Sequence, residues 1–156
     1  MRRRSLFSLF AAVAVTACAH PVTPVAEGPS MSWGLTESPD ENKLAYGEMG
    51  TDNVIVMLAC QPRSGEVLVT LVEHEARAAP ALTLQAGRAS SKRRAEAQPD
   101  MMTGGYLIEA ATPATDPALE RFRHGDALSV RVGGRRTQLP AADDQGRRFV
   151  ESCRGA

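Results

Sequence analysis

Short stretches in which apolar and polar residues alternate run through most of the chain after position 30, and turn residues separate them. Alternation over four to eight residues is typical of β-strands, because successive side chains of a strand point to opposite faces. We therefore expect strands at 31–36, 43–48, 53–60, 66–75, 81–86, 89–98, 106–111, 127–132 and 135–139. Residues 53–60 are apolar almost throughout, which predicts a strand covered on both faces at the centre of the core.

Turn residues indicate how some of these strands pair. Three connections that contain glycine, at 61–65, 87–88 and 133–134, join neighbouring strands and predict antiparallel hairpins. Each hairpin brings together segments that are adjacent in the chain. The order of the hairpins within a sheet does not follow from the turns.

Two short segments break the alternation and predict helices. Asp116 and Pro117 suit the N-cap and the first position of a helix that ends near residue 124. A second helix is expected at 143–153, with an apolar face that includes Cys153. The predicted fold class is mainly β (a β-rich α+β domain): an antiparallel sheet or small sandwich with two short helices, the last at the C-terminus.

The first 17 residues have a different character from the rest. Arg2, Arg3 and Arg4 precede an apolar run at 5–17, which is the pattern of an export signal peptide. Thirteen helical residues would cover about 20 Å, less than the roughly 30 Å of hydrocarbon in a bilayer. A removed signal peptide at 1–17 is therefore expected rather than a membrane span.

The end of this run, Val15-Thr16-Ala17-Cys18, resembles the lipobox of bacterial lipoproteins, in which small residues precede an obligatory cysteine. The resemblance implies cleavage before Cys18, attachment of diacylglycerol to its thiol, and acylation of its amine, with palmitate among the expected acyl groups. Because Ala19 follows instead of an Asp, it also implies transport to the outer membrane, with the domain facing the periplasm. Ordinary secretory cleavage after Ala19 is the open alternative.

Three cysteines occur in the chain. If Cys18 carries lipid, Cys60 and Cys153 remain as an even pair in an oxidising compartment, which predicts one disulfide. Two buried reduced thiols are the alternative. Neither cysteine has a second cysteine or a histidine at the spacing of a metal site, so no metal or cofactor is expected.

Differences in composition indicate that a tether at residues 18–30 precedes a domain at residues 31–156. Residues 18–30 contain three prolines and no apolar period, which predicts a flexible tether behind the lipidated cysteine. Residues 31–156 suffice for a single periplasmic domain. The whole chain has 18 basic and 18 acidic side chains, and loss of Arg2, Arg3 and Arg4 leaves 15 against 18. Nucleic acid is therefore not expected as a partner, whereas the membrane, through the lipid, and an envelope protein are.

The domain itself has a second resemblance. The stretches Leu44-Ala45-Tyr46-Gly47 and Thr51-Asp52-Asn53-Val54, followed by Cys60, are similar to uncharacterised alphaproteobacterial envelope lipoproteins. The similarity covers nearly the whole mature chain. It implies the same location and brings no known activity or site residue with it.

Candidate catalytic residues are few. His74 is expected to be a solvated residue at a strand end, and His124 to lie in the last turn of a helix, where a cation is favoured. The sequence contains no G-x-S-x-G, H-E-x-x-H or P-loop motif. Carboxylates in turns or at a helix start remain as candidates: Asp40, Glu41, Asp52, Asp143 and Asp144. The basic run Lys92-Arg93-Arg94 is expected to protect a strand edge, with an anion-binding patch as the alternative.

These patterns together predict a membrane-anchored envelope lipoprotein whose domain has a non-catalytic binding or structural role, and which is not an enzyme. Two alternatives stay open. One is a small periplasmic hydrolase that uses the turn carboxylates, and the other is an inhibitor of a periplasmic or host enzyme.

Overall fold

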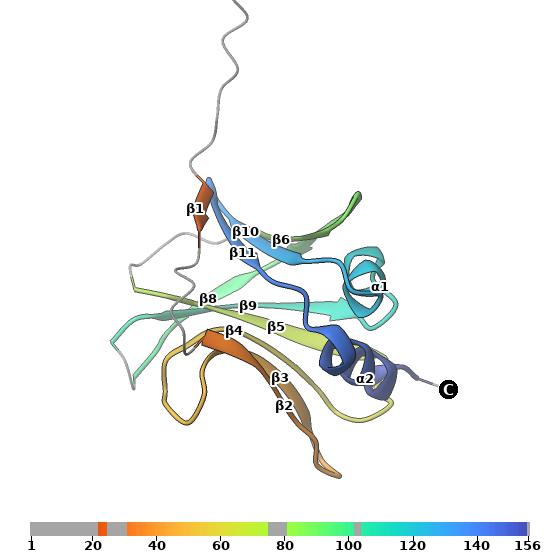
Figure 1. The fold of residues 1–156 in the computed structure, drawn as a ribbon. Coiled ribbons are helices and arrows are strands. Elements are labelled where there is room, and N and C mark those ends of the chain that lie inside the picture. The colour runs from red at the N-terminus through yellow and green to blue at the C-terminus, as the bar shows by residue number, and fades with distance from the viewer. Residues whose placement is uncertain (1–21, 25–30, 75–80, 102–103, 156) are drawn as a thin grey trace, which may run out of the picture.

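The computed structural model describes residues 22–24, 31–74, 81–101 and 104–155, which form two β-sheets and two helices (Figure 1). The strands are β1 (Val22–Pro24), β2 (Met31–Thr36), β3 (Asn42–Glu48), β4 (Val54–Cys60), β5 (Glu66–Glu73), β6 (Ala81–Ala86), β7 (Ala89–Arg94), β8 (Glu96–Pro99), β9 (Tyr106–Pro113), β10 (Leu128–Val132) and β11 (Arg135–Leu139). The helices are α1 (Pro117–Arg123) and α2 (Asp143–Cys153). The predicted mainly β class, with two short helices and the last at the C-terminus, is confirmed.

The strands are divided between two sheets that we call sheet A and sheet B. Sheet A has the order β1-β11-β10-β6-β7, and sheet B has the order β2-β3-β4-β5-β9-β8. Among the strand pairs of the described residues, only β1 with β11 is parallel, and the others are antiparallel. The three predicted hairpins are present as β4–β5, β6–β7 and β10–β11.

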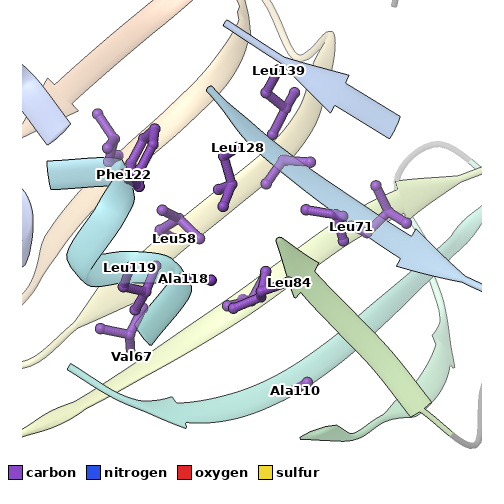
Figure 2. Packing of buried hydrophobic residues seen from close by; sticks show 14 of the residues in the cluster. Leu58, Val67, Leu71, Leu84, Ala110, Ala118, Leu119, Phe122, Leu128 and Leu139 are labelled. Carbon is purple, nitrogen blue, oxygen red and sulfur yellow. The ribbon is translucent and has the colours of Figure 1, made fainter. Parts of the chain in front are cut away.

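One hydrophobic core lies between the two sheets (Figure 2). Leu84 and Leu128 point into it from sheet A, and Leu58 and Leu71 point into it from sheet B. All four side chains are buried, as the period of two along each strand requires when one face is covered. The two sheets therefore share a single core and form one domain.

The two helices pack against each other and complete the core. Asp116 accepts a hydrogen bond from the N–H of Ala118, so it caps α1 as the sequence predicted. Phe122 of α1 is fully buried in the core. Gly146 permits the close packing of α2, because a Cβ there would lie 3.1 Å from the Cβ of Ala142 and 3.3 Å from the ring of Phe122.

The predicted strand at 89–98 is wrong in one respect, because the chain changes sheets within it. Residues Ala89–Arg94 form the edge strand β7 of sheet A, and Glu96–Pro99 form the edge strand β8 of sheet B. Ala95 lies between them and is buried. The alternation of polar and small residues continues through the corner, so the sequence pattern contains no sign of the change.

The expectation that 53–60 is covered on both faces is met only in part, because Ala59 is the one buried residue of β4 on the second face. Val56, Leu58 and Cys60 are buried on the face of β4 that looks into the core. Ile55 and Met57, on the alternate positions, are only half-buried. The apolar run therefore lies at the centre of sheet B, but its second face is partly open.

The predicted tether at 18–30 contains a short strand. Val22–Pro24 form β1, which pairs in parallel with β11, in the register Val22 with Arg136 and Pro24 with Gln138. Residues 18–21 and 25–30 lie outside the described residues. The prediction of a flexible tether over the whole of 18–30 is therefore wrong at these three residues. The exposed edge of β11 offers backbone hydrogen-bonding groups with which an extended segment can pair.

Candidate functional site

The disulfide joins the middle of sheet B to the last helix. The sulfurs of Cys60 and Cys153 are 1.99 Å apart and their Cα atoms 5.8 Å apart. Cys153 has no exposed surface, and Cys60 has 6 %. The pair that the sequence predicted is therefore present in the structure, and the alternative of two reduced thiols is wrong.

Backbone hydrogen bonds attach the turn after Cys60 to the same end of α2. The N–H of Arg63 donates to the carbonyl of Ser152, and the N–H of Gly65 donates to the carbonyl of Cys153, each at 2.9 Å. The side chain of Asn42, which is buried, donates to Ser152 Oγ at 2.8 Å. The C-terminal end of α2 is thus held by several contacts as well as by the disulfide.

The N-terminal end of α2 borders an open cleft of about 380 Å³. Ligand sites in proteins commonly have volumes of 300–1,000 Å³, so the cleft is large enough for a small ligand. Its lining comes from β2, β3 and the segment that leads into α2, and comprises Met31, Ser32, Trp33, Tyr46, Pro140, Ala141, Ala142, Asp143, Asp144 and Gln145. The sequence did not predict this site, because its two halves lie about a hundred positions apart in the chain.

Two aromatic rings form the floor of the cleft. The ring centroids of Trp33 and Tyr46 are 5.3 Å apart, and both side chains are buried. Trp33 Nε1 donates a hydrogen bond to the carbonyl of Pro140 at 2.9 Å. Gln145 completes the attachment, since its Oε1 accepts from the N–H of Leu35 and its Nε2 donates to the carbonyl of Trp33. The walls of the cleft are therefore fixed to one another.

The rim of the cleft is acidic. Asp143 and Asp144 are exposed at the first turn of α2, where carboxylates interact favourably with the helix dipole. The N-cap residue Ala142 has no side-chain oxygen and makes no capping bond. Asp143 has φ of 45°, in the left-handed region that costs a non-glycine residue about 1 kcal/mol or more.

The buried acid Asp116 joins the two sheets. Its carboxylate accepts hydrogen bonds from Arg93 of β7 at 2.6 Å and from Thr112 of β9 at 2.8 Å. Burial alone would raise the pKa of Asp116, but the neighbouring Ser91 hydroxyl and the hydrogen bonds from Thr112, Arg93 and the N–H of Ala118 outweigh burial and lower the pKa. Every described contact of this carboxylate belongs to the fold, which indicates a structural role.

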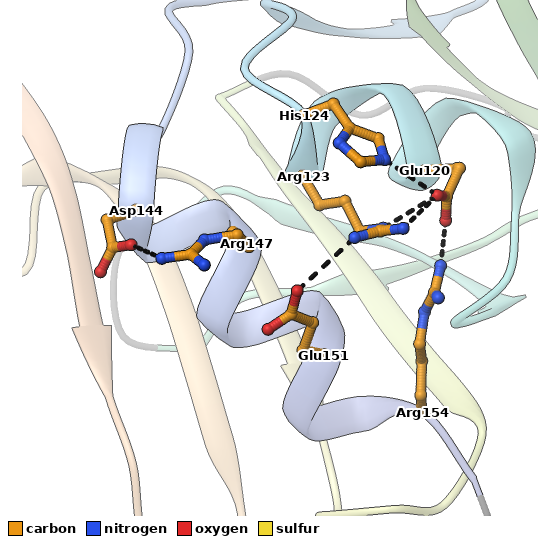
Figure 3. A network of polar contacts seen from close by, with 7 residues as sticks. All are labelled: Glu120, Arg123, His124, Asp144, Arg147, Glu151 and Arg154. Atoms are coloured by element: carbon orange, nitrogen blue, oxygen red, sulfur yellow. Dashed lines mark hydrogen bonds and ion pairs between the residues drawn. The ribbon is translucent and has the colours of Figure 1, made fainter.

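A second ionic cluster joins the two helices (Figure 3). Glu120 of α1 accepts hydrogen bonds from Arg123 and from Arg154, which follows α2. Arg123 also lies 3.5 Å from Glu151 of α2. The hydrogen bonds from Arg123, with the charge of Arg154, lower the pKa of Glu120 to about 2. The carboxylate therefore stays ionised at neutral pH and holds the helices together.

The two histidines of the domain lie at the ends of secondary-structure elements. His74 is exposed, whereas the preceding Glu73 is buried and pairs with Arg135 of sheet A at 2.9 Å. His124 follows α1 and lies 3.2 Å from Glu120. Both positions agree with the predicted strand-end and helix-end roles.

The candidate carboxylates do not gather in one place. Asp40 and Glu41 lie in the turn before β3, and Asp52 lies in the turn after it. The seven residues of β3 separate these turns by roughly 20 Å. Paired glycosidase carboxylates lie about 5–10 Å apart, so Asp40 and Asp52 do not meet that geometry.

The basic run of β7 is split between two faces. Arg93 points inward to Asp116, whereas Lys92 and Arg94 are exposed on the outer face of sheet A. β7 is an edge strand, as the strand-edge interpretation requires. The prediction that all three basic residues are exposed along the strand edge is therefore wrong for Arg93.

Cys18 and the predicted signal peptide lie outside the described residues. Within the described part, no helix has the length and apolar character needed to cross a bilayer. No cluster of three or more His, Cys, Asp or Glu side chains with the arrangement of a metal site occurs there either. Comparison of the chain with protein-family models, with curated proteins and with solved structures found no match.

Proposed function

We propose that this protein is a lipid-anchored envelope protein whose disulfide-bonded β domain acts by binding. The observation that carries the anchor is the pairing of Cys60 with Cys153. Of the three cysteines in the sequence, this pairing leaves Cys18, at the end of an apolar segment that resembles a lipobox. A disulfide of this kind also fits an oxidising compartment.

Metabolic labelling tests the anchor. Cells that express the full chain are fed an alkyne fatty acid, and the protein is then recovered and conjugated to a dye. Cys18→Ser should abolish the label and move the protein from the membrane fraction to the soluble envelope fraction. The matched control is Cys60→Ser with Cys153→Ser, which removes both sulfur atoms of the disulfide but keeps Cys18 and should keep the label. Equal labelling of the chain with Cys18→Ser contradicts the anchor.

The binding role rests on the cleft beside α2. Its fixed walls and aromatic floor provide apolar contact, and the carboxylate of Asp143 favours a ligand with a cationic or hydroxyl-bearing end, whereas Asp144 beside it is already paired with Arg147. No carboxylate pair with a catalytic separation was found between the turns at residues 40 and 52. A binding role therefore explains more of the described side chains than hydrolysis does.

Trp33 offers a direct measurement, because it is the only tryptophan in the chain and lies in the floor of the cleft. Amine-bearing and neutral saccharide fragments of the cell wall are titrated while tryptophan fluorescence is recorded. We expect a saturable change that Asp143→Asn weakens, while Asp40→Asn, in the turn at the other end of β3, leaves it unchanged. Equal responses of both variants would place the binding outside the cleft.

A further inference from the structure

Sheet A carries basic side chains without acidic ones. Its five strands contain six basic residues, Lys92, Arg93, Arg94, Arg131, Arg135 and Arg136, and no Asp or Glu. Arg93 and Arg135 point inward and pair with the buried acids Asp116 and Glu73. The other four lie on the outer face. Arg131 alternates with the buried Val130 and Val132, and Arg136 is opposite Arg131 on the neighbouring strand. Lys92 and Arg94 lie on either side of the inward-pointing Arg93.

Three of the outer cations form one row across the sheet. Arg136 of β11 is opposite Arg131 of β10, Arg131 is opposite Thr83 of β6, and Thr83 is opposite Lys92 of β7. We call Arg136, Arg131 and Lys92 the cationic row. None of the three has an ion pair within the described part of the chain. Arg94 is set apart, because it lines a hollow together with Glu96 and Glu109.

Edge protection does not explain this row. Lys92 lies on the edge strand β7, but Arg131 lies on β10, the central strand of sheet A. Like charges directly opposite each other on neighbouring strands destabilise a sheet, and Arg131 faces Arg136 in this way. The Nε atom of Arg136 is also buried without a hydrogen-bond partner. An external anion would compensate the repulsion between the two guanidinium groups.

The position of the N-terminal segment identifies the anion. Val22 of β1 is paired with Arg136, at one end of the cationic row. Cys18, the proposed lipid attachment site, lies four residues earlier in the chain, and four residues extend at most about 14 Å. A lipid on Cys18 would therefore hold this end of the row close to the bilayer surface. Figure 1 shows β1 at the edge of the sheet beside β11.

We propose that the outer face of sheet A, through Arg136, Arg131 and Lys92, docks onto the anionic phospholipid headgroups of the membrane that holds the lipid anchor. This inference deepens the proposed function and rests on the anchor at Cys18. Each basic residue near an anionic surface strengthens binding by about fivefold, the equivalent of about 1 kcal/mol. The anchor alone would leave the orientation of the domain open, whereas the row lays sheet A against the headgroups.

Vesicle binding without the lipid tests the surface separately from the anchor. The chain from residue 18 with Cys18→Ser keeps every described element, since these begin at Val22. Vesicles of phosphatidylcholine, with and without about 30 % phosphatidylglycerol, are sedimented with this protein. We expect association only with the anionic vesicles, and a steep decrease as salt rises to about 0.5 M, where screening is strong.

Charge-matched variants decide which face is responsible. Arg131→Gln with Lys92→Gln should weaken binding by about 25-fold, because each cation contributes about fivefold. The control Arg147→Gln with Arg148→Gln removes the same charge from exposed positions of α2, which packs against sheet B, and should change binding less than twofold. All four side chains are exposed, and urea unfolding verifies that each variant keeps its fold.

Four results would overturn the docking surface: equal binding by the sheet A variant and the unaltered chain, equal losses in both variants, equal binding to neutral vesicles, or release by low concentrations of inorganic phosphate. The last result would assign the row to a small phosphate anion instead. The two proposals fail separately. Fatty-acid labelling at Cys18 without vesicle binding rejects the docking surface alone, and vesicle binding without labelling rejects the anchor alone.

Discussion

Removal of the disulfide should destabilise the domain mainly through the unfolded chain. The bond closes a loop with a sequence separation of 93 residues, and the chain-entropy relation assigns such a loop about 4.6 kcal/mol at 25 °C. In the folded state, Phe149 and Val150 are fully buried, and two backbone hydrogen bonds hold the end of α2. We therefore expect Cys60→Ala with Cys153→Ala to fold, with most of these contacts retained.

Urea unfolding measures the loss. Domains of this size unfold with a slope of about 2 kcal/mol per molar urea, so 4.6 kcal/mol corresponds to a midpoint lower by about 2 M. Near-UV circular dichroism in water verifies that the native packing persists. Reduction of the unaltered disulfide should produce the same shift, whereas Cys18→Ser should produce none.

A midpoint shift of less than about 0.5 M, with native packing retained, would refute this reasoning. It would mean that the loop between Cys60 and Cys153 is already constrained in the unfolded chain. Loss of the near-UV circular dichroism signal in water would also refute the reasoning. It would mean that the disulfide, and not the buried apolar face of α2, holds the helix in place.

Three further predictions concern the ion pairs and one close backbone contact. Asp116→Ala should destabilise the fold by about 3 kcal/mol in urea unfolding, because Arg93 loses its partner and α1 loses its cap. Glu120→Gln should cost about 1 kcal/mol at pH 7 after solvent screening and almost nothing near pH 2. The pKa of Glu120 is lower in the folded state, so its contribution is present above about pH 4.5 and is lost as the pH falls towards 2. Gly47→Ala should lower the thermal midpoint by several degrees, because the added Cβ would lie 2.3 Å from the carbonyl oxygen of Asn53.

Each of these three predictions can be contradicted by a specific result. A loss below about 1 kcal/mol for Asp116→Ala would mean that Arg93 finds another partner. An unchanged pH profile in Glu120→Gln would assign the acid sensitivity to other carboxylates. Gly134→Ala is the control for Gly47→Ala, since a Cβ at Gly134 meets no atom within 4 Å. Equal effects of the two glycine substitutions would exclude the close contact as the cause.

Local patterns predicted the elements well. Strands at 31–36, 81–86 and 135–139 and the helix at 143–153 have the predicted bounds. Their signals are local, because the alternation of side chains, the glycine turns and the caps act over a few residues. The disulfide was predicted for a different reason, namely that a count of three cysteines leaves one pair after Cys18 is assigned to lipid.

The cleft and the cationic row were not predictable in the same way. Trp33 and Gln145 meet only because α2 returns to the edge of sheet B. Arg131 and Arg136 are neighbours across a predicted hairpin, but Lys92 joins their row only because β6 pairs with β10. Contacts of this kind between distant residues depend on the order of strands in a sheet. That order depends in turn on which apolar faces pack against each other.

The sequence by itself determined the types of the elements, the three hairpins and the cysteine pairing. Tertiary structure decided that the segment around Ala95 passes from one sheet to the other, that Arg93 turns inward while Lys92 stays outside, and that Val22–Pro24 add to sheet A. A repeat of two residues along a strand shows that neighbouring side chains point to opposite faces. It does not show which face is buried or which strand lies beside this one in the sheet. That choice is made by the packing of the whole core, and the surface proposed to bind the membrane depends on it.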